Sequence, residues 1–316
     1  MSVTIKEVAR ASGVSPATVS FVLNRTPGQV ITPATQERVR EAARALGYVP
    51  HGVARALREG TSRVVLLDVG ARRGGPILEG FILGMSTELA AHDHSLLVQH
   101  GTHDRALPSA IAAISPRAVV DISGPFRHVN PEAPEGGWVY GLASHALTQL
   151  AHLRDRGHTA VAFGAPVAHP GLPHDRLPHD RLPHLAQAAE RLGLAAAGVI
   201  SAGTDRDSAG TDRDSTGRAV ADLLQQHPEV TAIAAVDDET ALALLSALPR
   251  AGLSAPRDLA VIGFGDSEYG ALWTPALTTV HVEAERLGAH AARVAIGLEP
   301  LAEPTTGSRV VVRESA

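Results

Sequence analysis

Residues 2–58 read SVTIKEVARASGVSPATVSFVLNRTPGQVITPATQERVREAARALGYVPHGVARALR, and this stretch decides the fold of the N-terminal part of the chain. Thr4 and Glu7 have the spacing of a capping box, which predicts the start of a first helix. Gly13 allows the chain to turn within a few residues. Ser15, followed by a proline, then predicts the start of a second helix.

A third helix is predicted to follow the second. Thr32 stands before Pro33, which is a helix start, and Gly47 is a helix stop. Three short helices with a tight turn between the first two are typical of a helix-turn-helix DNA-binding unit. The alternative is a small helical bundle that has no partner.

The charge of the chain is divided unevenly. Residues 1–60 contain eight Lys and Arg and four Glu, a net charge of +4, whereas residues 61–316 contain 20 basic and 29 acidic residues, a net charge of −9. Such a basic head on an acidic body is expected of a modular DNA-binding protein. Since phosphate repels the acidic body, contact with DNA would be confined to the head.

The remaining 255 or so residues are enough for one large or two smaller α/β units. Apolar segments rich in Val, Ile and Ala alternate with amphipathic segments, which predicts parallel sheets covered by helices on both faces. Ligands of such sheets bind outside the carboxyl ends of the strands. Strands are predicted over residues 62–69, 95–100, 117–122, 159–164, 197–201, 231–236 and 259–264.

The N-terminal segments VTIKEVARASGVSPATVSFVLN, ITPATQERVREAARALGYVP and VARAL resemble the DNA-binding head of the LacI (lactose/galactose repressor) family. The resemblance implies that the second helix lies in the major groove and that two protomers bind a palindromic operator. It implies base-facing positions at Pro16, Ala17, Ser20 and Phe21. It further implies that four polar side chains bind phosphates or hold the docking geometry, namely Thr4, Ser15, Thr18 and Asn24.

Two of the base-facing positions depart from the family pattern. Many relatives have Arg where this chain has Phe21, and a polar residue where it has Ala17. Arg forms a bidentate pair with guanine and Phe cannot, so these positions can make only apolar contacts, for example with thymine methyl groups. The alternative for Phe21 is that it packs sideways on the third helix.

The segment HGVARALREG resembles the hinge helix of the same family. There a pair of such helices enters the minor groove, and a Leu wedges into the central base step. The resemblance places Leu57 in the wedge position and implies DNA contacts for Val53, Ala54 and Arg55. The alternative is an ordinary surface linker helix.

The body resembles the type I periplasmic-binding-protein fold that LacI relatives use as an effector-sensing core, most clearly over residues 145–297. The matching segments are HLRDRGHTAVAF, VDDETALALLSALPRAGLSAPRDLAVIGFGD, TPALTTV and ERLGAHAARVAI. The resemblance implies effector contacts at Arg181, Asp238 and Asp266. Asp238 has an alternative role as a helix N-cap, and Arg181 has an alternative as a surface residue, with Arg176 in its place.

Three features of the body depart from the family pattern. LPHDR is repeated at 172–184 and GTDRDS at 203–215, and these short tandem copies predict polar loop expansions rather than structural repeats. The segment over residues 117–142 is shorter than the strand and loop that relatives usually have there, and it is rich in Pro and Gly. Gly75 stands where relatives have a polar Asn before the proline.

Other functions find little support in the sequence. The 16 His residues lack a metal-ligand spacing, GFGDS is no dinucleotide fingerprint, and no catalytic motif is present. We therefore expect no metal, no cofactor and no enzymatic activity. The absence of cysteine, of a signal peptide and of an 18-residue apolar run predicts a cytoplasmic protein without a membrane span.

The sequence thus predicts a homodimeric regulator of transcription, a repressor whose affinity for its operator is modulated by a sugar-like small molecule. The alternative is a ligand-binding module of the same fold that no longer regulates. The predicted domains are a helix-turn-helix domain (1–48), a hinge helix and linker (49–61) and a two-lobed core (62–316). Lobe 1 is expected over about 62–140 and 266–297, and lobe 2 over about 141–265 and 298–316.

Overall fold

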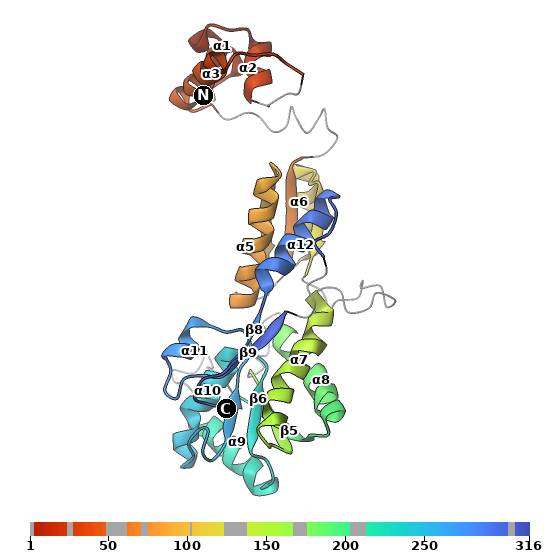
Figure 1. Ribbon diagram of the computed structural model, residues 1–316, viewed down its shortest axis with the longest axis vertical. Coiled ribbons are helices and arrows are strands. Elements are labelled where there is room, and N and C mark those ends of the chain that lie inside the picture. Colours follow the sequence, from red (N-terminus) through yellow and green to blue (C-terminus); the bar gives the residue numbers. More distant parts are fainter. Residues whose placement is uncertain are drawn as a thin grey trace. The chain divides into compact units, whose positions relative to one another are not determined.

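The computed structural model divides the chain into two compact units, Met1–Ser62 and Arg63–Ala316, and each unit is described by itself (Figure 1). The residues described are 3–23, 28–48, 62–70, 75–101, 103–122, 138–166, 176–202, 213–302 and 307–316.

The first unit consists of three helices, α1 (Ile5–Ser12), α2 (Pro16–Leu23) and α3 (Pro33–Leu46). Each helix contributes small or β-branched side chains to one core, and larger apolar side chains border it. This is the predicted helix-turn-helix arrangement. The buried core residues are Val8, Ala9, Val19, Val22, Val39 and Ala43.

The predicted start and stop signals operate as expected in this unit. The side chain of Glu7 accepts hydrogen bonds from the backbone N–H and the hydroxyl of Thr4, at 2.7 and 2.8 Å. Gly13 ends α1 with φ of 68°, a conformation that glycine adopts without steric cost. Arg38 of α3 donates from Nε to the carbonyl oxygen of Ser12 at 3.0 Å, which joins α3 to the end of α1.

The second unit begins with a parallel sheet in the order β2-β1-β3, made of β1 (Val64–Gly70), β2 (Ser95–His100) and β3 (Ala118–Asp121). Its helices are α5 (Pro76–Ala91), α6 (His103–Ile114) and α12 (Ala284–Ile296). Helices α5 and α12 lie side by side although they are far apart in the sequence (Figure 1). Apolar residues of both helices cover β1 and bury Val65, Leu67 and Val69.

Glycines allow α5 and α12 to approach closely. A Cβ atom on Gly84 of α5 would overlap the backbone carbonyl of Glu285, and one on Gly288 of α12 would overlap the backbone carbonyl of Phe81. The pair is also joined by an ion pair of 2.8 Å between Arg293 and Glu88. The two helices therefore pack backbone to backbone.

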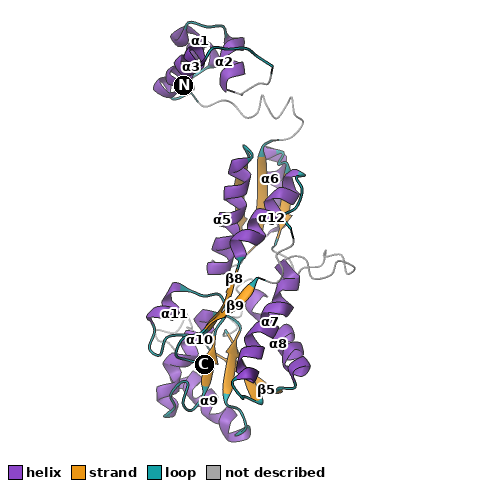
Figure 2. Ribbon diagram, viewed as in Figure 1, coloured by secondary structure: helices purple, strands orange, loops and turns teal. Residues whose placement is uncertain are grey.

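A second parallel sheet has the order β5-β4-β6-β7 and consists of β4 (Ala160–Ala165), β5 (Ala195–Ser201), β6 (Ala232–Ala235) and β7 (Ala260–Ile262). Helices cover both of its faces, as predicted (Figure 2). Successive residues of a strand face opposite sides of the sheet. The helices are α7 (Trp138–Asp155) and α8 (Arg176–Leu192) on one face, and α9 (Arg213–Gln226) and α10 (Asp238–Ala247) on the other.

The connection back to the first sheet runs through β8 (Thr279–Val282), which pairs antiparallel with β9 (Ser308–Val311), the strand that follows α12. Before it come the 3-10 turn η1 (Leu248–Ala251) and the short helix α11 (Glu268–Leu272). Leu277 is fully buried in the core of the second sheet. The chain therefore stays with that sheet up to β8 and then leads into α12 on the first sheet.

The prediction of a polar loop for the LPHDR copies is wrong over residues 176–184, which form the first turns of α8. Proline is normally excluded from a helix interior because it lacks an N–H, and this made the segment look like a loop. Pro183 nevertheless lies inside α8. The last residues of the second GTDRDS copy likewise begin α9, whereas residues 203–212 lie outside the described part, as do residues 123–137.

Among the described helices, none is long and apolar enough to span a membrane.

Candidate functional site

The predicted DNA-contacting residues of the first unit lie at its surface or close to it. Thr4, Ser15, Pro16 and Ala17 are exposed. Three further residues are half-buried, namely Thr18, Ser20 and Phe21. Asn24, Val53, Ala54, Arg55 and Leu57 lie outside the described residues.

Helix α2 turns Val19 and Val22 into the core of the unit. Phe21 is partly exposed and is not among the apolar side chains that build or border this core in the described part of the unit. Part of the Phe21 side chain therefore remains at the surface of α2.

Polar side chains at the start of α2 are occupied with one another. The Ser15 hydroxyl accepts a hydrogen bond from the backbone N–H of Thr18 at 3.1 Å, and the two hydroxyls lie 2.9 Å apart. The predicted N-cap at Ser15 is therefore present. On α1, the hydrogen bonds from Thr4 hold the pKa of the Glu7 carboxyl below its usual value, so Glu7 keeps its negative charge at the helix N-terminus.

A second candidate site lies in the second unit, at the carboxyl ends of β6 and β7. Gln149 of α7 is fully buried there, and its Nε2 donates to the carbonyl oxygens of Ala235, Gly263 and Ile262, at 2.8, 3.0 and 3.3 Å. These carbonyls stand at the ends of the two strands, where the backbone leaves the sheet. Gln149 therefore anchors α7 to the edge at which parallel sheets bind ligands.

Arg181 of α8 completes this anchor. Its Nη2 donates to Oε1 of Gln149 and its Nη1 to the carbonyl of Val236, both at 2.9 Å. The guanidinium carbon lies 3.3 Å from the centroid of the Phe264 ring, a cation–π contact. Burial lowers the pKa of Arg181 to about 9, and the guanidinium stays charged at pH 7. Arg181 is thus a buried residue, not a surface one.

His145 lies next to Arg181 and Phe264 and is also buried. Burial and the charge of Arg181 lower the pKa of His145 to about 4, so the ring is neutral at pH 7. Among the described residues, neither Nδ1 of His145 nor Nε of Arg181 has a hydrogen-bond partner. Buried polar atoms without a partner are uncommon and call for a ligand or another polar group.

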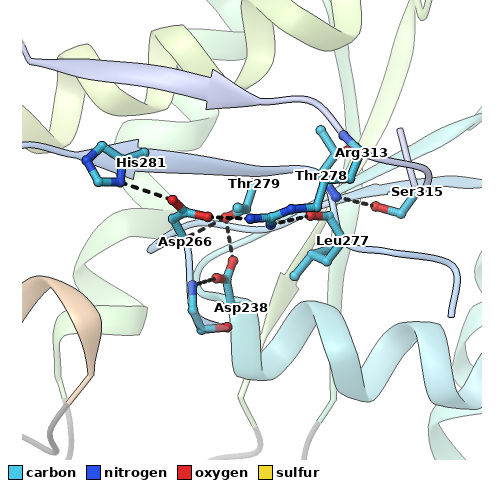
Figure 3. Close-up of polar contacts among 9 residues, drawn as sticks. Asp238, Asp266, Leu277, Thr278, Thr279, His281, Arg313 and Ser315 are labelled. Atoms are coloured by element: carbon cyan, nitrogen blue, oxygen red, sulfur yellow. Dashed lines mark hydrogen bonds and ion pairs between the residues drawn. The ribbon is translucent and has the colours of Figure 1, made fainter. Parts of the chain in front are cut away.

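Asp238 is buried at the start of α10, directly after β6. Its Oδ1 accepts from the Thr279 hydroxyl at 2.5 Å and its Oδ2 from the backbone N–H of Ser267 at 2.6 Å (Figure 3). Burial raises the pKa of its carboxyl, although these hydrogen bonds act in the opposite direction. The N-cap of α10 is the preceding residue, Asp237, which accepts from the N–H of Thr240 at 2.7 Å. The alternative of Asp238 as the N-cap is therefore wrong.

Asp266 lies in the turn after β7 with φ of 55°. Arg313 donates from Nη2 to its Oδ1 at 2.8 Å, and His281 Nδ1 lies 3.1 Å from its Oδ2 (Figure 3). The backbone N–H of Asp266 donates to Thr279 Oγ1 at 3.4 Å, so Thr279 links Asp266 to Asp238. Arg181, Asp238 and Asp266 are thus gathered at one sheet edge, and Arg313 and His281 were not foreseen.

We call the buried residues at this edge, together with the half-buried Asp266, the carboxyl-edge cluster. It offers a guanidinium, a neutral imidazole and two carboxylates, which suits binding of a polar small molecule and lacks the arrangement of a nucleophile beside a base. No group of His, Asp and Glu able to hold a metal ion occurs among the described residues. The members are His145, Gln149, Arg181, Asp238, Phe264, Asp266 and Thr279.

A helix-turn-helix unit followed by an α/β unit with a polar site at the strand ends defines a DNA-binding regulator with a ligand-binding core. Residues 4–51 match the family described as bacterial regulatory proteins, lacI family, and residues 150–316 match the periplasmic binding protein-like domain. The chain belongs to the LacI family of bacterial regulatory proteins and is a DNA-binding regulator of transcription, as its sequence predicted.

Similar proteins cover the chain almost end to end. It is 26% identical to the HTH-type transcriptional repressor PurR of Vibrio cholerae serotype O1, over 91% of this chain and 89% of that protein. It is 27% identical to the HTH-type transcriptional regulator CelR of Thermobifida fusca, over 93% and 91%.

Solved structures share the fold. The lac repressor dimer bound to operator and the anti-inducer ONPF has a TM-score of 0.70 and 18% identity, covering 100% of this chain and 99% of that one. The CelR–cellobiose complex has a TM-score of 0.62 and 22% identity, covering 99% and 100%.

Proposed function

We propose that the chain is a repressor that binds a palindromic operator as a homodimer. The observation that carries this is the three-helix unit, with its capped α2 and positive net charge, within the lacI-family match over residues 4–51. The lac repressor, whose fold is the same, is a dimer on its operator. A two-fold symmetric protein fits a palindrome because each protomer reads one half-site.

The proposed DNA contacts follow from the family resemblance, and the exposure of the described residues agrees with them. Pro16, Ala17, Ser20 and Phe21 face the bases of the major groove. Thr4, Ser15, Thr18 and Asn24 bind phosphates or hold the helix N-termini against the backbone, where positive dipole ends favour anions. Val53, Ala54 and Arg55 contact the minor groove, and Leu57 wedges into the central base step.

The carboxyl-edge cluster is the proposed effector site, with Arg181, Asp238 and Asp266 as contacts. Arg181 Nε and His145 Nδ1 have no partner in the described residues, and the carboxylates keep further lone pairs for hydroxyl groups. Cellobiose is bound by CelR, so a sugar-like effector is the leading class here. The effector changes operator affinity to the extent that it binds two conformations of the core unequally.

Further assignments complete the proposal. The chain acts in the cytoplasm, where its DNA is, and it catalyses no reaction. Its domains are the helix-turn-helix head (1–48), the hinge and linker (49–61) and a core from residue 62. The lobes take one parallel sheet each, and because Leu277 packs with the second sheet, the return to the first lobe is placed after β8 rather than at residue 266.

The test of DNA binding uses the full chain and the palindromes upstream of its own gene, measured by gel shift at moderate salt against random DNA of equal length. Selective binding supports the proposal, and equal affinity for random DNA overturns it. Leu57→Ala should weaken binding to the selected site more than binding to random DNA. Equal loss on both would remove the hinge assignment while leaving the rest.

A further inference from the structure

Helix α2 has apolar residues on two faces, and one of these faces packs in the core of the unit. Val19 and Val22 lie in the core, while Pro16 and Ala17 are exposed and Phe21 is half-buried outside that core. A surface helix of a small domain ordinarily has a polar outer face, and a helix that is apolar all round is covered by something. The outer face of α2, which we call the readout face, consists of Pro16, Ala17, Ser20 and Phe21, and Ser20 is its one polar member.

The polar side chains of α2 do not change this character. They are Thr18 and Ser20, and the Thr18 hydroxyl is held 2.9 Å from that of Ser15 in the N-cap. The helix has no charged side chain and no amide. It therefore lacks the Arg, Lys, Asn and Gln side chains that form bidentate hydrogen bonds with guanine or adenine.

The rest of the unit is suited to a polyanion. Lys6 and Arg10 are exposed on α1, and Arg40 and Arg44 are exposed on α3. Phe21, the aromatic residue of α2, is half-buried and therefore lies at the surface of a unit of positive net charge. Charge complementarity favours DNA over a second protein chain as the occupant of the readout face.

We infer that the readout face recognises thymine through its 5-methyl group, with Phe21 as the main contact; this rests on the proposed DNA-binding function. The 5-methyl of thymine is the one apolar group that a base pair displays in the major groove. Phe21 and Ala17 can bury it, whereas neither can satisfy the acceptors of guanine. The half-site therefore contains thymine at the base pair that Phe21 contacts. Guanine is disfavoured there because its hydrogen-bond acceptors lose water without gaining a donor.

The experiment first selects the preferred operator of the full-length protein from random double-stranded DNA. Each thymine of the half-site is then replaced by uracil, which differs only in lacking the methyl group. We expect at least one replacement to weaken binding about four-fold, the effect of one buried methylene-sized group. Cytosine at that position should bind better when it carries a 5-methyl group.

Variants then assign the effect to a residue. Phe21→Ala should bring the thymine-to-uracil ratio of affinities close to one at the same position, and Phe21→Leu should retain most of it. Leu46→Ala truncates another exposed apolar side chain of the unit and should leave the four-fold ratio unchanged. Unchanged thermal unfolding and low-salt affinity for random DNA show that the variants fold.

The outcomes separate the inference from the function on which it rests. If no sequence is enriched, the proposed DNA-binding function fails and the inference with it. If a sequence is enriched but every uracil-substituted site binds like the parent, the inference alone is overturned. A thymine-to-uracil ratio that survives in Phe21→Ala overturns the assignment to Phe21.

Discussion

Arg181 and Gln149 are joined by a hydrogen bond of 2.9 Å between Nη2 of the guanidinium and Oε1 of the amide, and both side chains are buried. Since Gln149 also donates to the ends of β6 and β7, this bond connects two helices to the edge at which a ligand would bind. An effector that contacts Arg181 would act on the packing of the lobe itself. Arg181, the proposed effector contact, thus also joins α8 to α7 within the lobe.

Replacement of Gln149 by Leu should destabilise the protein by about 3 kcal/mol. The buried Arg181 Nη2 loses its acceptor, and the strand-end carbonyls of Ala235 and Gly263 lose a donor, which costs more than the volume-matched apolar side chain returns. Urea unfolding followed by circular dichroism measures the change. Gln226→Leu, an exposed substitution on α9, is the control and should change stability by less than about 0.5 kcal/mol. Equal stability of both variants would show that the Gln149 network is not stabilising.

A second prediction concerns pH and His145, whose pKa of about 4 in the folded state lies below its usual value of 6.5. The unfolded chain takes up a proton at this residue as pH falls below 6.5, whereas the folded protein resists until about pH 4. The contribution of neutral His145 to the free energy of unfolding is therefore fully present above pH 6.5 and is lost as the pH falls toward 4.

Between pH 7 and pH 5 the loss from His145 should be about 2 kcal/mol. The lowered pKa values of His152 and His158 add to this loss, whereas the raised pKa of the Asp238 carboxyl acts against it. His145→Phe should reduce the difference in unfolding free energy between the two pH values by about that amount, and the exposed control His100→Asn should not. The same pH dependence in His145→Phe and the parent would contradict the assignment.

Short-range signals made the helices of the first unit predictable. The Ser15 and Thr32 hydroxyls cap helices because each accepts a hydrogen bond from the N–H three residues on, and the N–H and hydroxyl of Thr4 donate to the carboxylate of Glu7, again three residues on. These relations are contained within a few letters of sequence. The alternation of strands and helices in the core was equally local. Arg181 and Asp238 were assigned from family resemblance rather than from geometry.

The role of Gln149 could not be predicted in this way. Its hydrogen-bond partners are backbone carbonyls 86 and 114 residues away, and no side-chain type marks them in the sequence. Likewise, α8 extends across Pro183 because the apolar face formed by Leu185 and its neighbours packs on the sheet. Tertiary packing there outweighs the local preference that predicted a loop.

Two neighbouring carboxylates give a third prediction, on effector binding. Asp238 takes part in the carboxyl-edge cluster, whereas Asp237 caps α10. With a sugar panel that includes cellobiose, calorimetry on the full chain should find one ligand whose affinity falls at least ten-fold in Asp238→Asn. Asp237→Asn should bind nearly as the parent does, because Asn is an equally good N-cap. Equal effects of the two variants would remove Asp238 from the site.

The contact between α5 and α12 gives a fourth prediction, in which two effects have opposite signs. Alanine is a better helix former than glycine by about 1 kcal/mol, so helix propensity alone predicts that Gly84→Ala stabilises the protein. A Cβ atom at this position, however, would overlap the carbonyl of Glu285, and both atoms belong to packed backbones that must separate. Overpacking of this kind costs about 1–3 kcal/mol.

We therefore expect Gly84→Ala to destabilise the protein by about 2 kcal/mol, measured as the shift of the urea midpoint. Ser86→Ala lies on the exposed face of the same helix and isolates the propensity effect, so it should be neutral or slightly stabilising. Because Gly288 stands in the same contact, Gly288→Ala should have an effect as large as that of Gly84→Ala. A stabilised Gly84→Ala would mean that α5 and α12 separate without loss, and that their close approach does not hold the first sheet.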